Sequence, residues 1–151
     1  MTHFDPLHEL NDAIWNDGGF VNAHAHFDRA YTVTNKNMND VVYNHLHQKW
    51  EYVDKYKREA TEEEIYQNII RALYNQKHLL TSHCLSFIDV DPVVGFKALH
   101  AAQRAKQYAK AIGIEFKIAC QTLKGVVDNR CQVMIIDAVE QNAVDIIGSL
   151  P

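Results

Sequence analysis

The sequence shows neither a secretory signal pattern nor a long apolar run. Its first residues show no basic stretch followed by an apolar one, as a secretory signal would. No run approaches the roughly 18 consecutive apolar residues that span a bilayer. The three cysteines, Cys84, Cys120 and Cys131, are widely spaced and form no C-x-x-C pair, which excludes a disulfide scaffold and the common cysteine zinc sites. We therefore expect a soluble, cytoplasmic protein with no membrane partner.

A strong charge of either sign is absent too. The 15 basic and 19 acidic residues give a net charge of −4 with neutral histidine. A module that binds a nucleic-acid duplex is usually basic, so we expect no nucleic-acid partner. The length of 151 residues, with 47% hydrophobic and 23% charged residues, is typical of one globular domain. This composition excludes a disordered, collagen-like or coiled-coil chain.

Several catalytic motifs are missing. The chain has no glycine-rich phosphate loop, no G-x-S-x-G and no H-E-x-x-H. The H-x-E…P-C-x-x-C pattern of the compact zinc deaminases is absent as well. Nine histidines, in contrast, are many for this length. The candidate site residues are therefore found among histidines, carboxylates and amides.

Hydrophobic periodicity predicts strands that alternate with helices. A polar segment, 1–18, ends in an Asp-Gly-Gly turn signal and precedes them. Thr61 and Glu64 have the spacing of a helix capping box. The alternation predicts βαβ units and a parallel sheet, whose right-handed crossovers place all the βα loops at one edge. The predicted strands are 20–26, 79–90, 114–120 and 144–147, and the predicted helices are 40–59, 62–78, 93–111 and 130–142.

His24 and His26 form the most informative pair. Strand side chains alternate with a period of two, so both imidazoles point to one face, about 6–7 Å apart at Cα. At that separation both can bind one divalent ion. The alternative is a chance pair among many histidines. His45 and His47 illustrate it, because on a predicted helix they point about 200° apart and cannot chelate.

Polar residues at other strand ends are further candidates. Asp28 is either a hydrogen-bond acceptor that orients a ligand histidine or the loop after it, or a turn former. Asp89 is a candidate ligand or acceptor, whereas Asp91 precedes a proline and is favoured as a turn or cap residue. Gln121 either binds a substrate amide or carbonyl, or satisfies backbone groups. For Arg29 a salt bridge to Asp28 or elsewhere is favoured over contact with a substrate.

One stretch resembles a known family. Residues 20–29, Phe-Val-Asn-Ala-His-Ala-His-Phe-Asp-Arg, resemble the H-x-H-L-D opening of the amidohydrolase superfamily, nearest its cytosine-deaminase-like branch. Segments 86–92, 120–126 and 144–151 agree with that branch in order and spacing. The resemblance implies a partial TIM (β/α)8-type barrel of about four parallel strands with intervening helices. Residues 19–151 would be the N-terminal half of that barrel.

The resemblance also implies an activity. Members of this superfamily are hydrolases that use a zinc or iron-type ion to activate water against a non-peptide C–N bond. By resemblance, His24 and His26 match the metal ligands of the first strand, and Gln121 lies near a substrate-binding position. This sequence departs from the pattern at 85–89, which lacks an arginine and a histidine. The offset of Gln121 from Gly125 differs too, and the later-strand ligands and general base have no counterpart in 151 residues.

Three hypotheses follow from the sequence. The first is the N-terminal half of such a hydrolase, acting on a small molecule and completed by a C-terminal half-barrel or by self-association. Two histidines alone bind zinc weakly, so we expect low metal occupancy and little activity from the isolated chain. The second is a non-catalytic half-barrel that docks or oligomerises through open sheet edges and an apolar inner face. The third is a complete small α/β protein with an incidental H-x-H.

Overall fold

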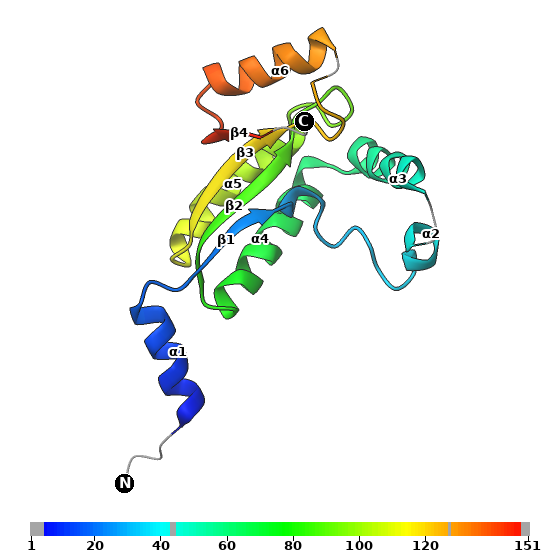
Figure 1. Cartoon of the computed structure of the whole chain (residues 1–151). Coiled ribbons are helices and arrows are strands. Elements are labelled where there is room, and N and C mark those ends of the chain that lie inside the picture. Colours follow the sequence, from blue (N-terminus) through cyan, green and yellow to red (C-terminus); the bar gives the residue numbers. More distant parts are fainter. Residues whose placement is uncertain (1–4, 43–44, 127, 149–151) are drawn as a thin grey trace.

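The computed structural model describes residues 5–42, 45–126 and 128–148 as one sheet with helices around it (Figure 1). All strand pairs are parallel, and the strands lie in sequence order, β1–β2–β3–β4. This arrangement confirms the predicted α/β fold with four parallel strands and intervening helices. The strands are β1 Phe20–Ala25, β2 Thr81–Asp89, β3 Glu115–Gln121 and β4 Ile146–Ile147.

The helices occupy the connections that the periodicity predicted, with additions near the N-terminus. The 3-10 turn η1 and the helices α2 and α3 fill the first part of the connection from β1 to β2. Residues 43–44 of the predicted helix 40–59 lie outside the described residues. So do residues 149–151, the end of the segment 144–151. The helices are α1 Pro6–Asn16, η1 Phe27–Arg29, α2 Met38–Val42, α3 Leu46–Glu59, α4 Glu62–His78, α5 Lys97–Ala111 and α6 Asn129–Glu140.

Helices α4 and α5 pack on one face of the sheet and form the core with it (Figure 1). The predicted capping box starts α4, because the Glu64 amide donates to Thr61 Oγ1 at 3.2 Å and the Thr61 amide donates to Glu64 Oε2 at 2.8 Å. Small side chains let α5 approach the sheet closely. The buried residues of these two helices are Ile65, Ile69, Ala72, Leu73, Ala98, Leu99, Ala101, Ala102, Ala105 and Ala109.

The opposite face of the sheet is more open to solvent. On β2, the buried Cys84, Ser86 and Ile88 alternate with the more exposed His83, Leu85 and Phe87. We expected this inner face to be apolar. That prediction is wrong near the start of β3, because the charged side chains of Glu115 and Lys117 lie there. The polar trio consists of Glu115 with Lys117 at 3.2 Å and His83 at 3.4 Å.

Helix α3 brings polar residues into the interior, although apolar residues recur along it at helical spacing. Leu46 is 58% exposed, and Trp50 and Val53 are only partly buried. The two buried side chains of the helix are Asp54 and Lys57. The helix thus forms over most of its predicted length, but the residues that it buries are charged and not apolar.

A lysine of α5 fixes the end of α3. The Lys97 ammonium donates to the Lys57 carbonyl oxygen at 2.9 Å and to the Ala60 carbonyl oxygen at 2.7 Å. These carbonyls lie at a helix C-terminus, where a cation is favoured by the helix dipole and by unpaired acceptors. This contact places Lys57 beside the carboxyl ends of the strands.

Two further observations complete the fold. The free cysteines Cys84, Cys120 and Cys131 are buried. Across the described residues, no helix combines the length and apolar composition needed for a bilayer crossing.

Candidate functional site

The structure brings His24 and His26 together where β1 ends. Both rings lie against the Phe87 ring of β2, with centroids 4.6 Å and 5.7 Å away. The register of β1 with β2 is irregular between Asn22 and Ala25, so strict alternation is interrupted. The imidazoles nevertheless converge, and their Nε2 atoms lie 3.3 Å apart.

This separation fits two ligands of one metal ion. A tetrahedral ion with Zn–N bonds of about 2.0–2.1 Å holds two ligand nitrogens about 3.3 Å apart. Among the described residues, no group of three or more histidines, cysteines or carboxylates is arranged to hold a metal. The pair therefore offers two coordination positions and leaves the rest of a shell to other groups.

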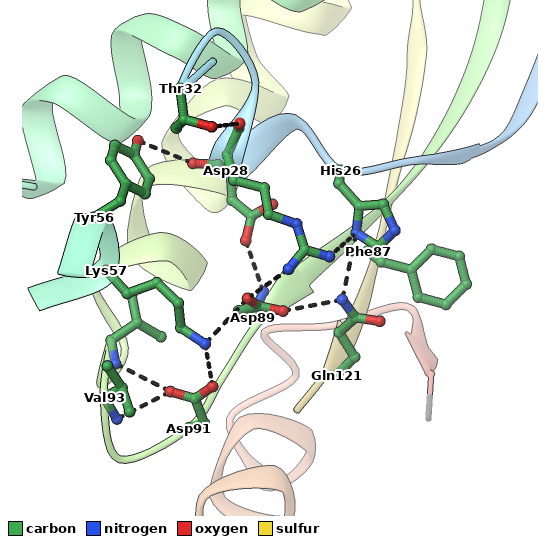
Figure 2. Close-up of polar contacts among 12 residues, drawn as sticks. His26, Asp28, Thr32, Tyr56, Lys57, Phe87, Asp89, Asp91, Val93 and Gln121 are labelled. Atoms are coloured by element: carbon green, nitrogen blue, oxygen red, sulfur yellow. Dashed lines mark hydrogen bonds and ion pairs between the residues drawn. The ribbon is translucent and has the colours of Figure 1, made fainter. Parts of the chain in front are cut away.

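Asp89, at the end of β2, lies at the centre of the polar contacts beside His26 (Figure 2). Its side chain is 1% exposed. Arg29 Nη1 lies 3.1 Å from Asp89 Oδ2, Lys57 Nζ lies 3.2 Å from the same oxygen, and Gln121 Nε2 donates to Oδ1 at 2.9 Å. The predicted meeting of Asp89 and Gln121 at the histidine end of the sheet is thus observed.

His26 joins this network through its other ring nitrogen. Arg29 Nη2 donates to His26 Nδ1 at 2.7 Å, and Gln121 Nε2 lies 3.3 Å from the same nitrogen. Burial and the Arg29 charge lower the pKa of His26 to about 4, although Asp89 acts in the opposite direction. At neutral pH the ring is therefore uncharged, which is the state that can bind a metal.

Asp28 supports the backbone rather than a histidine. Its Oδ2 accepts a hydrogen bond from the Asp89 amide at 3.0 Å. Its Oδ1 is buried and has no partner among the described residues. Burial, reinforced by the Asp89 charge, raises the pKa of Asp28 to about 7. Of the two predicted alternatives, the structure favours a role in holding the loop against β2.

Lys57 is the member of the cluster that the sequence analysis missed. It lies between Asp89 and Asp91, and its side chain is 4% exposed. Burial alone would lower the pKa of Lys57, but the two carboxylates outweigh burial and raise it. The available signal was its position four residues after Val53, which places both residues on the same side of that helix.

Asp91 has the turn role that its place before a proline indicated. Its Oδ1 accepts from the amides of Val93 at 2.9 Å and Val94 at 3.1 Å. The Arg29 salt bridge is made to Asp89 and not to Asp28. Cys120 is fully buried in the core.

The chain is similar in sequence to parts of longer proteins. No protein-family model matches it. It is 34% identical over 142 residues to a Haemophilus influenzae protein described as uncharacterized, covering 94% of this chain and 50% of that protein. It is 27% identical over 135 residues to an N-isopropylammelide isopropyl amidohydrolase of Pseudomonas sp. strain ADP, covering 87% of this chain and 33% of that enzyme. The chain thus spans about half or less of these relatives.

Solved structures share the fold. A 5-methylcytosine deaminase from Klebsiella pneumoniae liganded with 5-fluorocytosine superposes with a TM-score of 0.66 at 23% identity, over 83% of this chain and 30% of that one. The same enzyme liganded with phosphonocytosine gives a TM-score of 0.68 at 23% identity, over 82% and 29%. This likeness shows that the sheet and its helices have the architecture of part of a larger (β/α) protein.

Proposed function

We propose that this chain is the N-terminal half of a metal-dependent amidohydrolase that acts on non-peptide C–N bonds of small molecules, in the manner of cytosine deaminases. His24 and His26 would hold a divalent ion, zinc or iron, through their Nε2 atoms. The observation that carries the proposal is the 3.3 Å separation of these nitrogens at the carboxyl end of β1. That edge is where parallel α/β sheets place their sites. The similarity to an amidohydrolase and to a deaminase structure supports the same assignment.

The neighbouring residues receive distinct roles in this proposal. Gln121, which is 5% exposed, would present its amide to a carbonyl or ring nitrogen of the substrate. Asp89 would hold that amide in place, because it already accepts a hydrogen bond from Gln121 Nε2. Asp28 would fix the turn that follows His26 through its bond to the Asp89 amide. A bound divalent ion supplies Lewis-acid chemistry, which lowers the pKa of water.

The proposal also needs groups that the described residues do not bring to the histidine pair. The remaining metal ligands and a general base would come from further barrel strands. We propose that a C-terminal half-barrel, or a second copy of this chain, covers the inner face and supplies them. With two nitrogens alone, metal binding by the 151 residues would be weak.

The alternative is a non-catalytic half-barrel that docks to a partner. The observation in its favour is exposed apolar surface at both edges of the sheet. Phe20 and Val21 on β1 are 54% and 68% exposed, and Ile146 and Ile147 on β4 are 47% and 59% exposed. Such unpaired edges favour pairing with another strand.

Zinc titration of histidine variants tests the metal site. We expect the wild-type chain to bind one zinc ion weakly, and His24→Ala/His26→Ala to lose that binding. The matched control is His45→Ala/His47→Ala, which removes the same residue types from an exposed helix start. Equal zinc binding by all three proteins would refute the proposed site.

A further inference from the structure

The environment of His26 Nδ1 is the feature of interest, and the inference from it rests on the proposed metal site. An imidazole that binds a metal through Nε2 carries its proton on Nδ1 and donates it to an acceptor, usually a carboxylate or a carbonyl. The residue at His26 Nδ1 is instead Arg29, whose Nη2 lies 2.7 Å away. A guanidinium has only donors.

The metal-free hydrogen bonds therefore fix the opposite arrangement of the ring. With Arg29 donating to it, His26 Nδ1 presents a lone pair, and the proton of the neutral ring lies on Nε2. That proton is directed to His24 Nε2, 3.3 Å away. It occupies the space between the two nitrogens, where the ion would lie.

Asp89 provides the means to exchange these bonds. It already holds Arg29 through Nη1 at 3.1 Å, so Arg29 keeps a partner after releasing the histidine. Asp89 is also linked to His26 through Gln121, whose Nε2 lies 2.9 Å from Asp89 Oδ1 and 3.3 Å from His26 Nδ1. Both donors that face Nδ1, Arg29 and Gln121, are thus also bonded to Asp89 and keep that partner when they leave the ring.

We propose that Arg29 is a positioning residue that competes with the metal for His26. In the metal-free chain it holds the ring with Nδ1 as acceptor. When an ion binds at Nε2, Arg29 releases Nδ1 and remains on Asp89. Each state of the histidine pair thereby has its own set of hydrogen bonds, and Arg29 reduces the affinity for the ion.

Nitrogen NMR of the histidine rings tests the first half of the proposal on the wild-type chain. We expect metal-free His26 to carry its proton on Nε2, and zinc addition to move the proton to Nδ1. A metal-free ring already protonated on Nδ1 would overturn the proposal. This readout needs no substitution and is not changed by a purely structural role of Arg29.

Zinc affinity of arginine variants tests the second half. We expect Arg29→Met to bind zinc about tenfold more tightly than the wild type, because a charge-assisted hydrogen bond no longer has to be broken. The matched control is Arg130→Met, since the Arg130 side chain is 80% exposed and lies 3.9 Å from its ion-pair partner. We expect no change in that variant.

The outcomes separate this inference from the proposed function. Unchanged or weaker zinc binding by folded Arg29→Met would overturn the competition, while loss of binding in His24→Ala/His26→Ala would leave the metal site standing. If no protein shows saturable zinc binding, the metal site and the inference both fall. If Arg29→Met does not fold, the tautomer of wild-type His26 with and without zinc decides the proposal.

Discussion

At the scale of single residues, the structure separates buried charges from exposed ones. Lys57 lies between Asp89 and Asp91 with almost no exposure, whereas Lys117 pairs with Glu115 at 3.2 Å and both of these side chains are about half exposed. A buried charge that loses its partner is costly, because water cannot replace the lost contact. An exposed pair contributes little, because solvent screens it.

Substitution of these two lysines should therefore have very different effects. We expect Lys57→Met to lower the free energy of unfolding by about 3–5 kcal/mol, since it leaves two buried carboxylates without their shared cation. Lys117→Met, which removes a cation from an exposed pair, should change it by about 0–1 kcal/mol. Urea denaturation of both variants measures the difference. Similar losses would contradict the assignment of Lys57 to a buried cluster.

The cysteines lead to a second prediction at this scale. Burial raises the pKa of the Cys84 thiol to about 11. It raises the pKa of Cys120 and Cys131 as well. Thiolate is the reactive form, so all three should react slowly with an alkylating reagent at pH 8 in the native protein. Mass spectrometry should show rapid labelling only after denaturation, and fast native labelling of Cys84 would contradict its place in the core.

The parts of the site that could be predicted are those determined by strand ends. His26, Asp89 and Gln121 meet because parallel strands bring their carboxyl ends to one edge, whatever the details of packing. Lys57 could not be placed, because it reaches the site from a helix whose docking depends on long-range contacts such as the Lys97 cap. Arg29 pairs with Asp89, which lies 60 residues away in the chain, so local sequence does not determine that partner either.

At the scale of elements, local signals predicted the helices best. The capping box of α4 was identified because Thr61 and Glu64 act on each other within one turn. Helix α5 begins at Lys97 rather than at Val93, because the Asp91 carboxylate binds the Val93 and Val94 amides in a turn. Periodicity alone does not reveal such competition between a side chain and the helix.

Helix α1 was missed within a segment described only as polar. It buries no residue, so it has no apolar stripe packed on the core. Its signals are local, since Asp5 accepts from the Leu7 amide at 3.0 Å and Pro6 occupies the first turn. Figure 1 shows this helix projecting away from the sheet, where tertiary contacts contribute little to it.

A glycine before β1 gives a prediction for this element. Gly19 has φ +74°, and a Cβ there would lie 2.7 Å from the Leu80 carbonyl oxygen. Gly95 has φ +64° with open space around it. Both Gly→Ala variants should lose about 1 kcal/mol from the left-handed conformation. Gly19→Ala should lose roughly 1–3 kcal/mol more, because backbone must move. Thermal or urea unfolding compares the two, and equal losses would argue against this close approach.

At the scale of the whole molecule, a parallel sheet with consecutive strands has two open edges. Within the described part of the chain, β1 and β4 each pair with a single neighbour. Exposed apolar side chains lie on both strands, so the isolated chain has edges that favour association. Local sequence does not indicate which surface pairs with these edges, because strand pairing at an edge depends on both surfaces.

We therefore predict that the isolated chain self-associates. We also predict that charged residues introduced at its sheet edges by substitution prevent this association. In analytical ultracentrifugation the wild type should sediment above its monomer mass of 17.3 kDa. Val21→Lys/Ile147→Lys should return it to the monomer, because lysine on an edge strand opposes strand pairing. Leu79→Lys replaces an exposed leucine, 62% accessible, outside the strands, and should have no effect. A monomeric wild type that binds no apolar dye would contradict the prediction.

The polar trio on the inner face limits which kind of surface could cover it. Glu115 pairs with Lys117 and His83 while water still reaches all three side chains. Sealing them from solvent would cost several kcal/mol per ion unless new hydrogen bonds compensate. A complementary surface must therefore contribute polar atoms at this depth or trap hydration water there. A purely apolar covering surface would therefore bind this face of the sheet poorly.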